Sequence, residues 1–163
     1  MKFKTVEQKI QAVLDSIADS DRKNRGFSDA RWTKLIKLGL RSLGQELGHD
    51  VSAFGLEKSS EWMFDLMWSR QTEDDYFERV ALAVEIEWKM DEENIFRDFE
   101  KLLVAKAPLK LMVFQQASKG GVAARVKNLT RAIRKFKGKF ASERYLIAGY
   151  SCETSTFHYS IVV

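Results

Sequence analysis

Three charged side chains occupy alternate positions at the end of an apolar run. The run covers residues 80–89 and ends with Glu85, Glu87 and Lys89. Its β-branched residues, its alternation and its lack of Gly and Pro predict a strand, in which alternate side chains share a face. The two carboxylates would then lie roughly 7 Å apart, and at an effective dielectric of about 20 their repulsion costs on the order of 2 kcal/mol. A positive charge should offset this cost, either Lys89 or a metal ion.

A further carboxylate, Asp65, is the only charge inside the apolar part of a second predicted strand, residues 61–68. A lone buried carboxylate is costly. The polar segment between the two strands fits a hairpin loop, and a hairpin folded about Asp75 places Asp65 opposite Glu85 and diagonal to Glu87. Diagonal neighbours on one face of a sheet are close enough to share an ion. The sequence therefore predicts an acidic site with a lysine at the end of a sheet.

In the combination of Asp65 with Glu87-Trp88-Lys89 on the next strand, the chain resembles the PD-(D/E)XK nucleases, the restriction-endonuclease-like superfamily. The resemblance implies that Asp65 and Glu87 bind Mg²⁺ or Mn²⁺. It also implies that Lys89 orients or activates the attacking water or stabilises charge. Glu85 is a further candidate metal ligand. The Pro that usually precedes the Asp is missing, and Phe64 stands in its place.

The resemblance also implies two candidates outside the motif. In some members the catalytic lysine lies on the helix after the motif strand, and Lys101 could reach the site from there; because Lys89 is present, Lys101 ranks second. Members often place a Glu of the preceding helix near the metal, which makes Glu46 a candidate ligand. The alternative, an exposed Glu at a helix end, is the more common situation.

Apolar periodicity and local signals predict ten elements. Helices are expected over about residues 5–21, 28–47, 92–106 and 118–136, and strands over about residues 50–56, 61–68, 80–89, 109–115, 145–150 and 157–163. The strand–helix–strand unit after residue 80 predicts two parallel strands. We therefore expect an α/β fold with a central mixed sheet flanked by helices. The resemblance implies a restriction-endonuclease-like α-β-β-β-α-β core, with an extra N-terminal helix and a C-terminal helix and hairpin.

Length and composition are those of one globular domain. The 163 residues divide into an N-terminal helix and linker (1–26), a core (28–116) and a basic helix with a hairpin (118–163). No apolar run resembles a membrane span or a signal peptide, so the sequence predicts a cytoplasmic protein without membrane contact. Cys152 is the only cysteine, which excludes an internal disulfide and a cysteine-based zinc site.

The net charge of +4 is unevenly distributed. Acids outnumber bases over residues 57–100, whereas Glu143 and Glu153 are the only acids after residue 101. An acidic centre beside a basic flank is typical of a metal site next to a polyanion-binding surface, although two solvated faces would give the same pattern. The predicted DNA-phosphate contacts are on the basic helix: Arg125, Lys127, Arg131, Arg134 and Lys135.

Together these observations predict a metal-dependent nuclease that hydrolyses phosphodiester bonds in DNA, with Mg²⁺ or Mn²⁺ as cofactor, because carboxylates suit these ions. One alternative is a nuclease-fold module that no longer cleaves and binds nucleic acid or a protein partner. Another is a structural domain in which Glu85, Glu87 and Lys89 form a surface salt-bridge ladder. The sequence leaves open DNA or RNA as substrate, and a monomer or a homodimer.

Overall fold

The computed structural model describes residues 4–24, 26–56 and 63–163, which form four helices and six strands. The helices are α1 (Val6–Lys23), α2 (Asp29–Glu46), α3 (Glu92–Val104) and α4 (Lys119–Lys135). The strands are β1 (Asp50–Ala53), β2 (Leu66–Gln71), β3 (Phe77–Glu87), β4 (Leu109–Gln116), β5 (Arg144–Ser151) and β6 (Thr156–Val162). This order of elements is the one that the sequence predicts.

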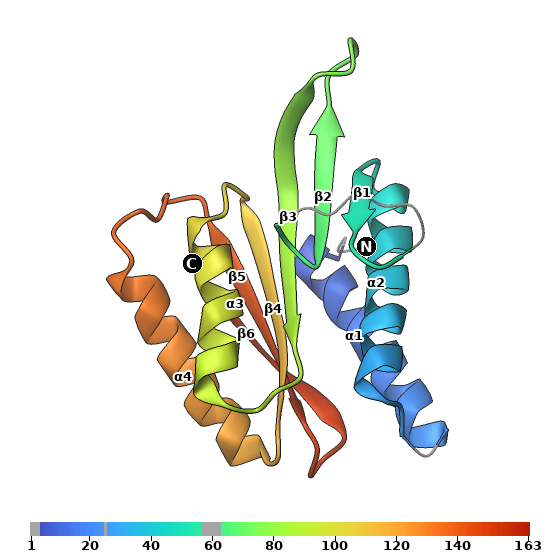
Figure 1. The fold of residues 1–163 in the computed structure, drawn as a ribbon, viewed down its shortest axis with the longest axis vertical. Helices are drawn as coiled ribbons and strands as arrows, with labels where there is room; N and C mark the ends of the chain where they lie inside the picture. The colour runs from blue at the N-terminus through green and yellow to red at the C-terminus, as the bar shows by residue number, and fades with distance from the viewer. Residues whose placement is uncertain (1–3, 25, 57–62) are drawn as a thin grey trace.

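The strands form a single mixed sheet in the order β1-β2-β3-β4-β5-β6. Strands β1, β2 and β3 are antiparallel, β3, β4 and β5 are parallel, and β6 is antiparallel to β5. Helices α1 and α2 cover one face of the sheet, and α3 and α4 cover the other (Figure 1). The predicted α/β fold with a central mixed sheet flanked by helices is confirmed.

Local signals in the sequence explain where the helices begin and end. Thr5 and Gln8 form the predicted capping box, in which the Gln8 N–H donates to Thr5 Oγ1 at 3.2 Å and the Thr5 N–H to Gln8 Oε1 at 3.0 Å. The hydroxyl of Ser28 caps α2 by accepting the Arg31 N–H at 3.3 Å. After α2 the chain passes through Gly48 at φ +77°, a left-handed conformation that glycine adopts without strain.

Two apolar cores lie on the two faces of the sheet. Side chains of α1 and α2 pack on Leu82, Val84 and Ile86 of β3, whereas those of α3 and α4 pack on the opposite face around Ala83 and Met112. Alternation along β3 therefore separates the cores as expected for a central strand.

The buried stripe of α2 differs from the prediction at one position. The apolar periodicity predicts Leu35 in the stripe, but Leu35 is half-buried and belongs to neither core, while Lys37 is buried with 4% of its surface exposed. A buried ammonium requires hydrogen-bonding partners, and these lie at the candidate site described below.

Two strands are shorter at the site than the sequence predicts. Strand β2 begins at Leu66, so Asp65 precedes the strand rather than lying within it; the expected first part of this strand, including Trp62, falls outside the described residues. Strand β3 ends at Glu87. Trp88, the next residue, packs against the same core as Ile86, and its indole N–H donates to Thr33 Oγ1 of α2 at 2.8 Å. The strand therefore ends two residues before the predicted end at Lys89, which lies outside it.

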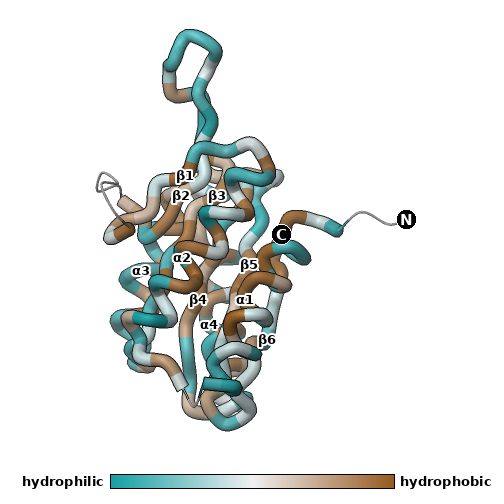
Figure 2. Tube along the Cα trace, turned by 90° about the vertical axis from the view of Figure 1, so that its right-hand side faces the viewer, coloured by the Kyte–Doolittle hydropathy of each residue, from teal (hydrophilic) through white to brown (hydrophobic). Residues whose placement is uncertain are grey.

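The hairpin of β2 and β3 extends well beyond the helices, and its tip is largely hydrophilic (Figures 1 and 2). Its turn contains Asp75, as predicted, at φ +65°. The register pairs Leu66 with Val84, so that Asp65 and Glu85 are the next residues toward the site. No helix among residues 4–24, 26–56 and 63–163 is long and apolar enough to cross a membrane.

Candidate functional site

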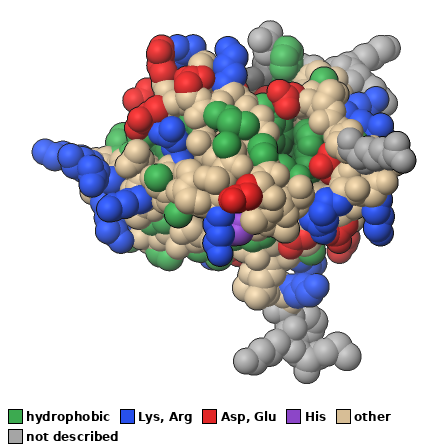
Figure 3. All heavy atoms as spheres, turned by 90° about the horizontal axis from the view of Figure 1, so that it is seen from below, with side chains coloured by type: hydrophobic (Ala, Val, Ile, Leu, Met, Phe, Trp, Pro, Cys, Tyr) green, Lys and Arg blue, Asp and Glu red, His purple; other side chains and the backbone are tan. Residues whose placement is uncertain are grey.

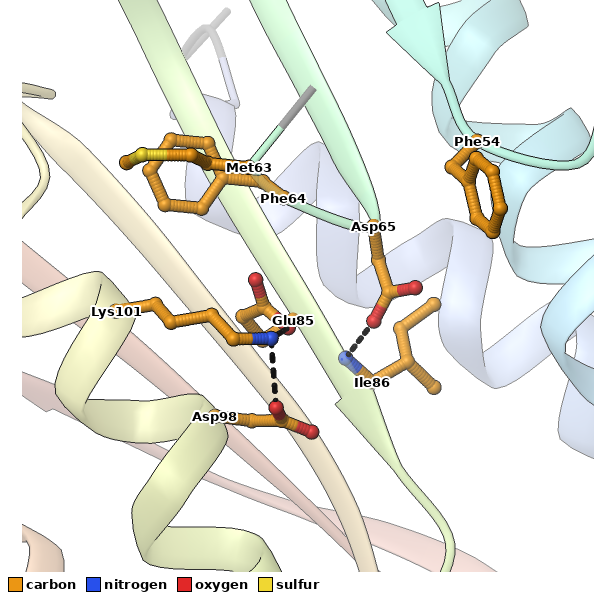
Figure 4. A pocket seen from close by; sticks show the side chains of 8 residues that line it. All are labelled: Phe54, Met63, Phe64, Asp65, Glu85, Ile86, Asp98 and Lys101. Atoms are coloured by element: carbon orange, nitrogen blue, oxygen red, sulfur yellow. Dashed lines mark hydrogen bonds and ion pairs between the residues drawn. The ribbon is translucent and has the colours of Figure 1, made fainter. Parts of the chain in front are cut away.

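Asp65 is held in place at three points where the chain enters β2. Its Oδ2 accepts a hydrogen bond from the backbone N–H of Ile86 at 2.9 Å, and its Oδ1 accepts one from Lys37 Nζ at 3.1 Å. Its backbone carbonyl accepts the N–H of Phe54 at 3.2 Å. Figure 4 shows the carboxylate directed toward β3. The side chain of Asp65 is 25% exposed, so the carboxylate remains accessible despite these bonds.

Glu85 lies beside Asp65 on β3 and is almost completely buried, with 1% of its surface exposed. Its Oε2 lies 3.3 Å from Lys101 Nζ, whereas its Oε1 has no hydrogen-bond partner among the described residues. Burial and the negative charge of Asp65 raise the pKa of Glu85 to about 8, against the opposing effect of Lys101. Glu85 therefore carries a proton near neutral pH, until a cation favours its charged form.

Lys101 reaches the same place from α3. Its Nζ lies 2.8 Å from Asp98 Oδ1, one turn earlier on the helix, and 3.3 Å from Glu85 Oε2. Burial alone would lower the pKa of Lys101, but the hydrogen bonds and charges of Asp98 and Glu85 together raise it. Lys101 is therefore a permanent cation at neutral pH, and with 43% of its side chain exposed it can be approached from solvent.

These groups line an open cavity of about 310 Å³ (Figure 4). The lining residues are Phe54, Met63, Phe64, Asp65, Glu85, Ile86, Asp98 and Lys101. Within the described ranges, no three His, Cys, Asp or Glu side chains form a group that could hold a metal ion. A cation at this place would rest on Asp65 and the unpartnered oxygen of Glu85. It would take its other ligands from water or substrate, as Mg²⁺ commonly does.

The structure does not bring the other predicted site residues into this cavity. Glu87 is half-buried, and its Oε1 accepts the backbone N–H of Lys89 at 2.7 Å. Lys89 follows the end of β3 and is exposed. Glu46 is 70% exposed and lies 3.7 Å from Lys9 of α1. Of the two candidate lysines, the second-ranked Lys101 is the one that lines the cavity.

Sequence reasoning missed two residues of the site, Lys37 and Asp98. Asp98 and Lys101 are three residues apart on a helix, a spacing at which side chains are neighbours, so Asp98 could have been found once Lys101 was considered. Lys37 follows Ile36 of the apolar stripe of α2, and the apolar periodicity does not mark it as buried. Nothing in the sequence indicates that its partner is Asp65.

The basic helix α4 lies apart from the cavity, next to α3. Lys127, Arg131, Arg134 and Lys135 are exposed, as phosphate contacts would require. Arg125 is different, because its side chain is 12% exposed and lies 3.3 Å from Glu92. A groove of about 370 Å³ between the two helices is lined by Glu92, Phe96, Asn128, Arg131, Ala132 and Lys135. Seen from below, one group of Lys and Arg side chains projects from the left side of the molecule, on which α4 lies (Figure 1), and others are spread over the rest of this face (Figure 3).

Fold and site together define an α/β protein with a mixed six-stranded sheet and a lysine–carboxylate cavity beside its central strands. Comparison of the chain with protein-family models, with curated proteins and with solved structures finds no match.

Proposed function

We propose that the protein is a metal-dependent nuclease whose site is formed by Asp65, Glu85 and Lys101. The observation that carries this proposal is the unpartnered oxygen of Glu85, a side chain that is almost completely buried and yet lines an open cavity beside a second carboxylate and an ammonium group. A buried carboxylate oxygen without a partner is destabilising, and such groups persist mainly where they have a task.

The arrangement of elements supports this proposal. The order α2-β1-β2-β3-α3-β4 agrees with the α-β-β-β-α-β core that the resemblance to PD-(D/E)XK nucleases implies, with the helices on opposite faces of the sheet. Asp65 directly precedes the second strand of this core, and Glu85 lies on the third. The motif carboxylate would then be Glu85 instead of Glu87, and the lysine of the site would come from the following helix.

The chemistry of each side chain fits phosphodiester hydrolysis. Asp65 and Glu85 would hold Mg²⁺ or Mn²⁺, an ion that polarises the phosphate and makes a bound water more acidic. Lys101 keeps its proton because its pKa is raised, so its role is to stabilise negative charge on the phosphate rather than to act as a base. The exposed cations of α4 would contact phosphates further along the nucleic acid.

The proposal is tested by metal binding and cleavage in the same variants. We expect Mn²⁺ to bind the wild type in calorimetry, with an affinity that increases from pH 6 to pH 8 because Glu85 releases its proton. Asp65→Asn and Glu85→Gln should lose this binding and the cleavage of linear, nicked, branched or single-stranded DNA. Glu87→Gln is the matched control and should retain both. Equal Mn²⁺ binding by all four proteins would refute the site.

A second candidate function is a nuclease-fold module that binds nucleic acid without cleaving it. One observation favours it: the two positive charges of Lys37 and Lys101 balance the negative charges of Asp65 and Asp98, so the site is neutral without a metal while Glu85 is protonated. DNA binding through α4 in a protein that binds no Mn²⁺ and cleaves no DNA or RNA would identify this alternative.

A further inference from the structure

Lys37 is the least expected charge in the molecule. It lies in the middle of α2 with 4% of its surface exposed. A lysine is rarely buried to this extent unless its ammonium group is paired and hydrogen-bonded, because removing the charge from water is costly. Its Nζ has two acceptors among the described residues, Phe54 O at 2.8 Å and Asp65 Oδ1 at 3.1 Å. Both belong to the region that joins β1 to β2.

The two acceptors flank that connection. Phe54 directly follows β1 and Asp65 directly precedes β2, and the Phe54 N–H also donates to the Asp65 carbonyl at 3.2 Å. The single ammonium group therefore links the end of one strand to the start of the next from the helix that covers them. Because α2 is packed into the apolar core through Ile36 and Leu40, the Lys37 stem has a rigid base.

The other oxygen of Asp65 connects to the strand that carries Glu85. Pairing of β2 with β3 stops at Leu66 and Val84, and the next N–H on the β2 side of β3, that of Ile86, donates to Asp65 Oδ2 at 2.9 Å. The carboxylate thus takes the place of a strand carbonyl, and its plane is fixed between Lys37 on one side and β3 on the other.

We infer that Lys37 is the positioning residue of the site: it fixes the Asp65 carboxylate against β3, in the orientation in which Asp65 faces the same cavity as Glu85. This inference rests on the proposed function of that cavity. Lys37 touches neither substrate nor metal in this role and acts through Asp65. Because its positive charge also opposes a cation on Asp65, the inference implies that metal affinity is sacrificed for orientation.

Lys34 provides a matched control. It lies one turn before Lys37 on α2 and is exposed, and both lysines line a second cavity, of about 510 Å³, on the α2 side of Asp65. Lys34→Met and Lys37→Met remove the same charge from the same helix and keep the stem length. Only Lys37→Met removes a hydrogen bond to Asp65.

The first readout is hydrogen exchange of the Ile86 amide, measured by NMR without metal. Lys37→Met is expected to lower the protection of this amide by about tenfold relative to the amides of β4, because a carboxylate that is no longer fixed is a poorer acceptor. Lys34→Met should leave it unchanged. Wild-type protection of Ile86 in Lys37→Met would overturn the inference.

The second readout separates positioning from a purely structural role. At saturating Mn²⁺, Lys37→Met is expected to lower kcat roughly tenfold or more, because the misplaced Asp65 no longer holds the reacting geometry. Its affinity for Mn²⁺ should be equal to or higher than that of the wild type. Unchanged kcat in the folded variant would also contradict the inference.

The two proposals fail in different ways. If the wild type binds no Mn²⁺, the proposed function is refuted. The positioning role of Lys37 is still tested by hydrogen exchange of the Ile86 amide, which requires neither metal nor activity. If Lys37→Met does not fold, Lys37→Gln replaces it, since the amide can donate to Phe54 O but carries no charge. The same loss of Ile86 protection is expected there, and its absence would overturn the inference.

Discussion

Lys101 Nζ, from α3, lies 3.3 Å from one oxygen of Glu85, while the other oxygen of that carboxyl group has no hydrogen-bond partner among the described residues. Only one of the two oxygens of Glu85 therefore has a partner among the described residues. Since its pKa is raised to about 8, mainly by burial and then by Asp65, its charge state changes near neutral pH. The charge on Glu85 should control both the stability of the protein and the binding of a cation.

Glu85→Gln should remove a pH dependence of stability. Between pH 4.5 and 8 the folded metal-free protein holds a proton on Glu85 that the unfolded chain has released. The stabilisation by this proton is complete below pH 4.5 and is lost as the pH rises through 8, by roughly 3–5 kcal/mol in total. Urea unfolding of the metal-free proteins should show similar stabilities at pH 5 and a more stable Glu85→Gln protein at pH 9.

Mg²⁺ should reverse the difference in stability between the wild type and Glu85→Gln at high pH. At pH 8 the ion should stabilise the wild type by mass action and leave Glu85→Gln unchanged. A wild-type protein whose free energy of unfolding is constant from pH 5 to pH 9 would show that Glu85 titrates normally.

Lys101→Met should abolish cleavage, whereas Lys89→Met should not. Lys101 lines the cavity, and removal of one preorganised positive group that stabilises developing charge costs roughly 100-fold or more in kcat. Lys89 is exposed beyond the end of β3, so the loss of its charge should change kcat by less than about threefold. Single-turnover cleavage at saturating Mn²⁺ measures both. Cleavage that is lost in Lys89→Met and retained in Lys101→Met would assign the stabilisation of charge to Lys89.

Arg131→Glu and Arg134→Glu should weaken the binding of any DNA by similar factors. Both side chains are exposed on α4, and phosphate contacts carry no sequence information. The slope of log K against log salt concentration should fall by about one for each phosphate interaction that the substitution removes. Lys23→Glu, at the exposed end of α1, is the control and should leave the slope unchanged. Equal slopes in all these proteins would place the polyanion surface elsewhere.

Lys110→Met should destabilise the protein by roughly 3 kcal/mol, because it leaves a buried carboxylate without its cation. Lys110 is completely buried at the start of β4, and its Nζ lies 2.8 Å from Glu143 Oε2 and 3.1 Å from the Tyr145 hydroxyl. The exposed Lys106 serves as the control in denaturant unfolding. The double variant Lys110→Met/Glu143→Gln should recover part of the stability, and a Lys110→Met protein as stable as Lys106→Met would contradict this account.

The order of elements was predictable because each one carries its own signal. The Thr5 capping box, the apolar run of β3 and the stop after α2 at Gly48 all depend on neighbouring residues in the chain; the cap and the stop are found at the predicted residues, and the strand predicted over 80–89 covers Phe77–Glu87. The hairpin turn at Asp75 was predictable for the same reason, and with it the approach of Asp65 to Glu85.

The site was only partly predictable because strand ends depend on interactions between distant residues. Strand β3 ends at Glu87, and the Trp88 carbonyl just beyond it accepts a hydrogen bond from the side chain of Gln115, 27 residues away, so Lys89 lies outside the strand. The pairing of Lys37 with Asp65 spans 28 residues and has no local signal. Periodicity finds the carboxylates but not the lysines that accompany them.

The bond from the Ile86 N–H to the Asp65 carboxylate also restricts the pairing of β2 with β3. If β2 shifted by one residue along β3, the side chains of Phe64 or Leu66 would stand where the carboxylate stands now, and neither can accept a hydrogen bond. The misaligned hairpin would bury an unpaired N–H and leave the Lys37 ammonium without its anion. The groups proposed for catalysis thus also discriminate against misfolded alternatives, and a substitution at Asp65 should reduce the fraction of chains that reach the correct strand alignment.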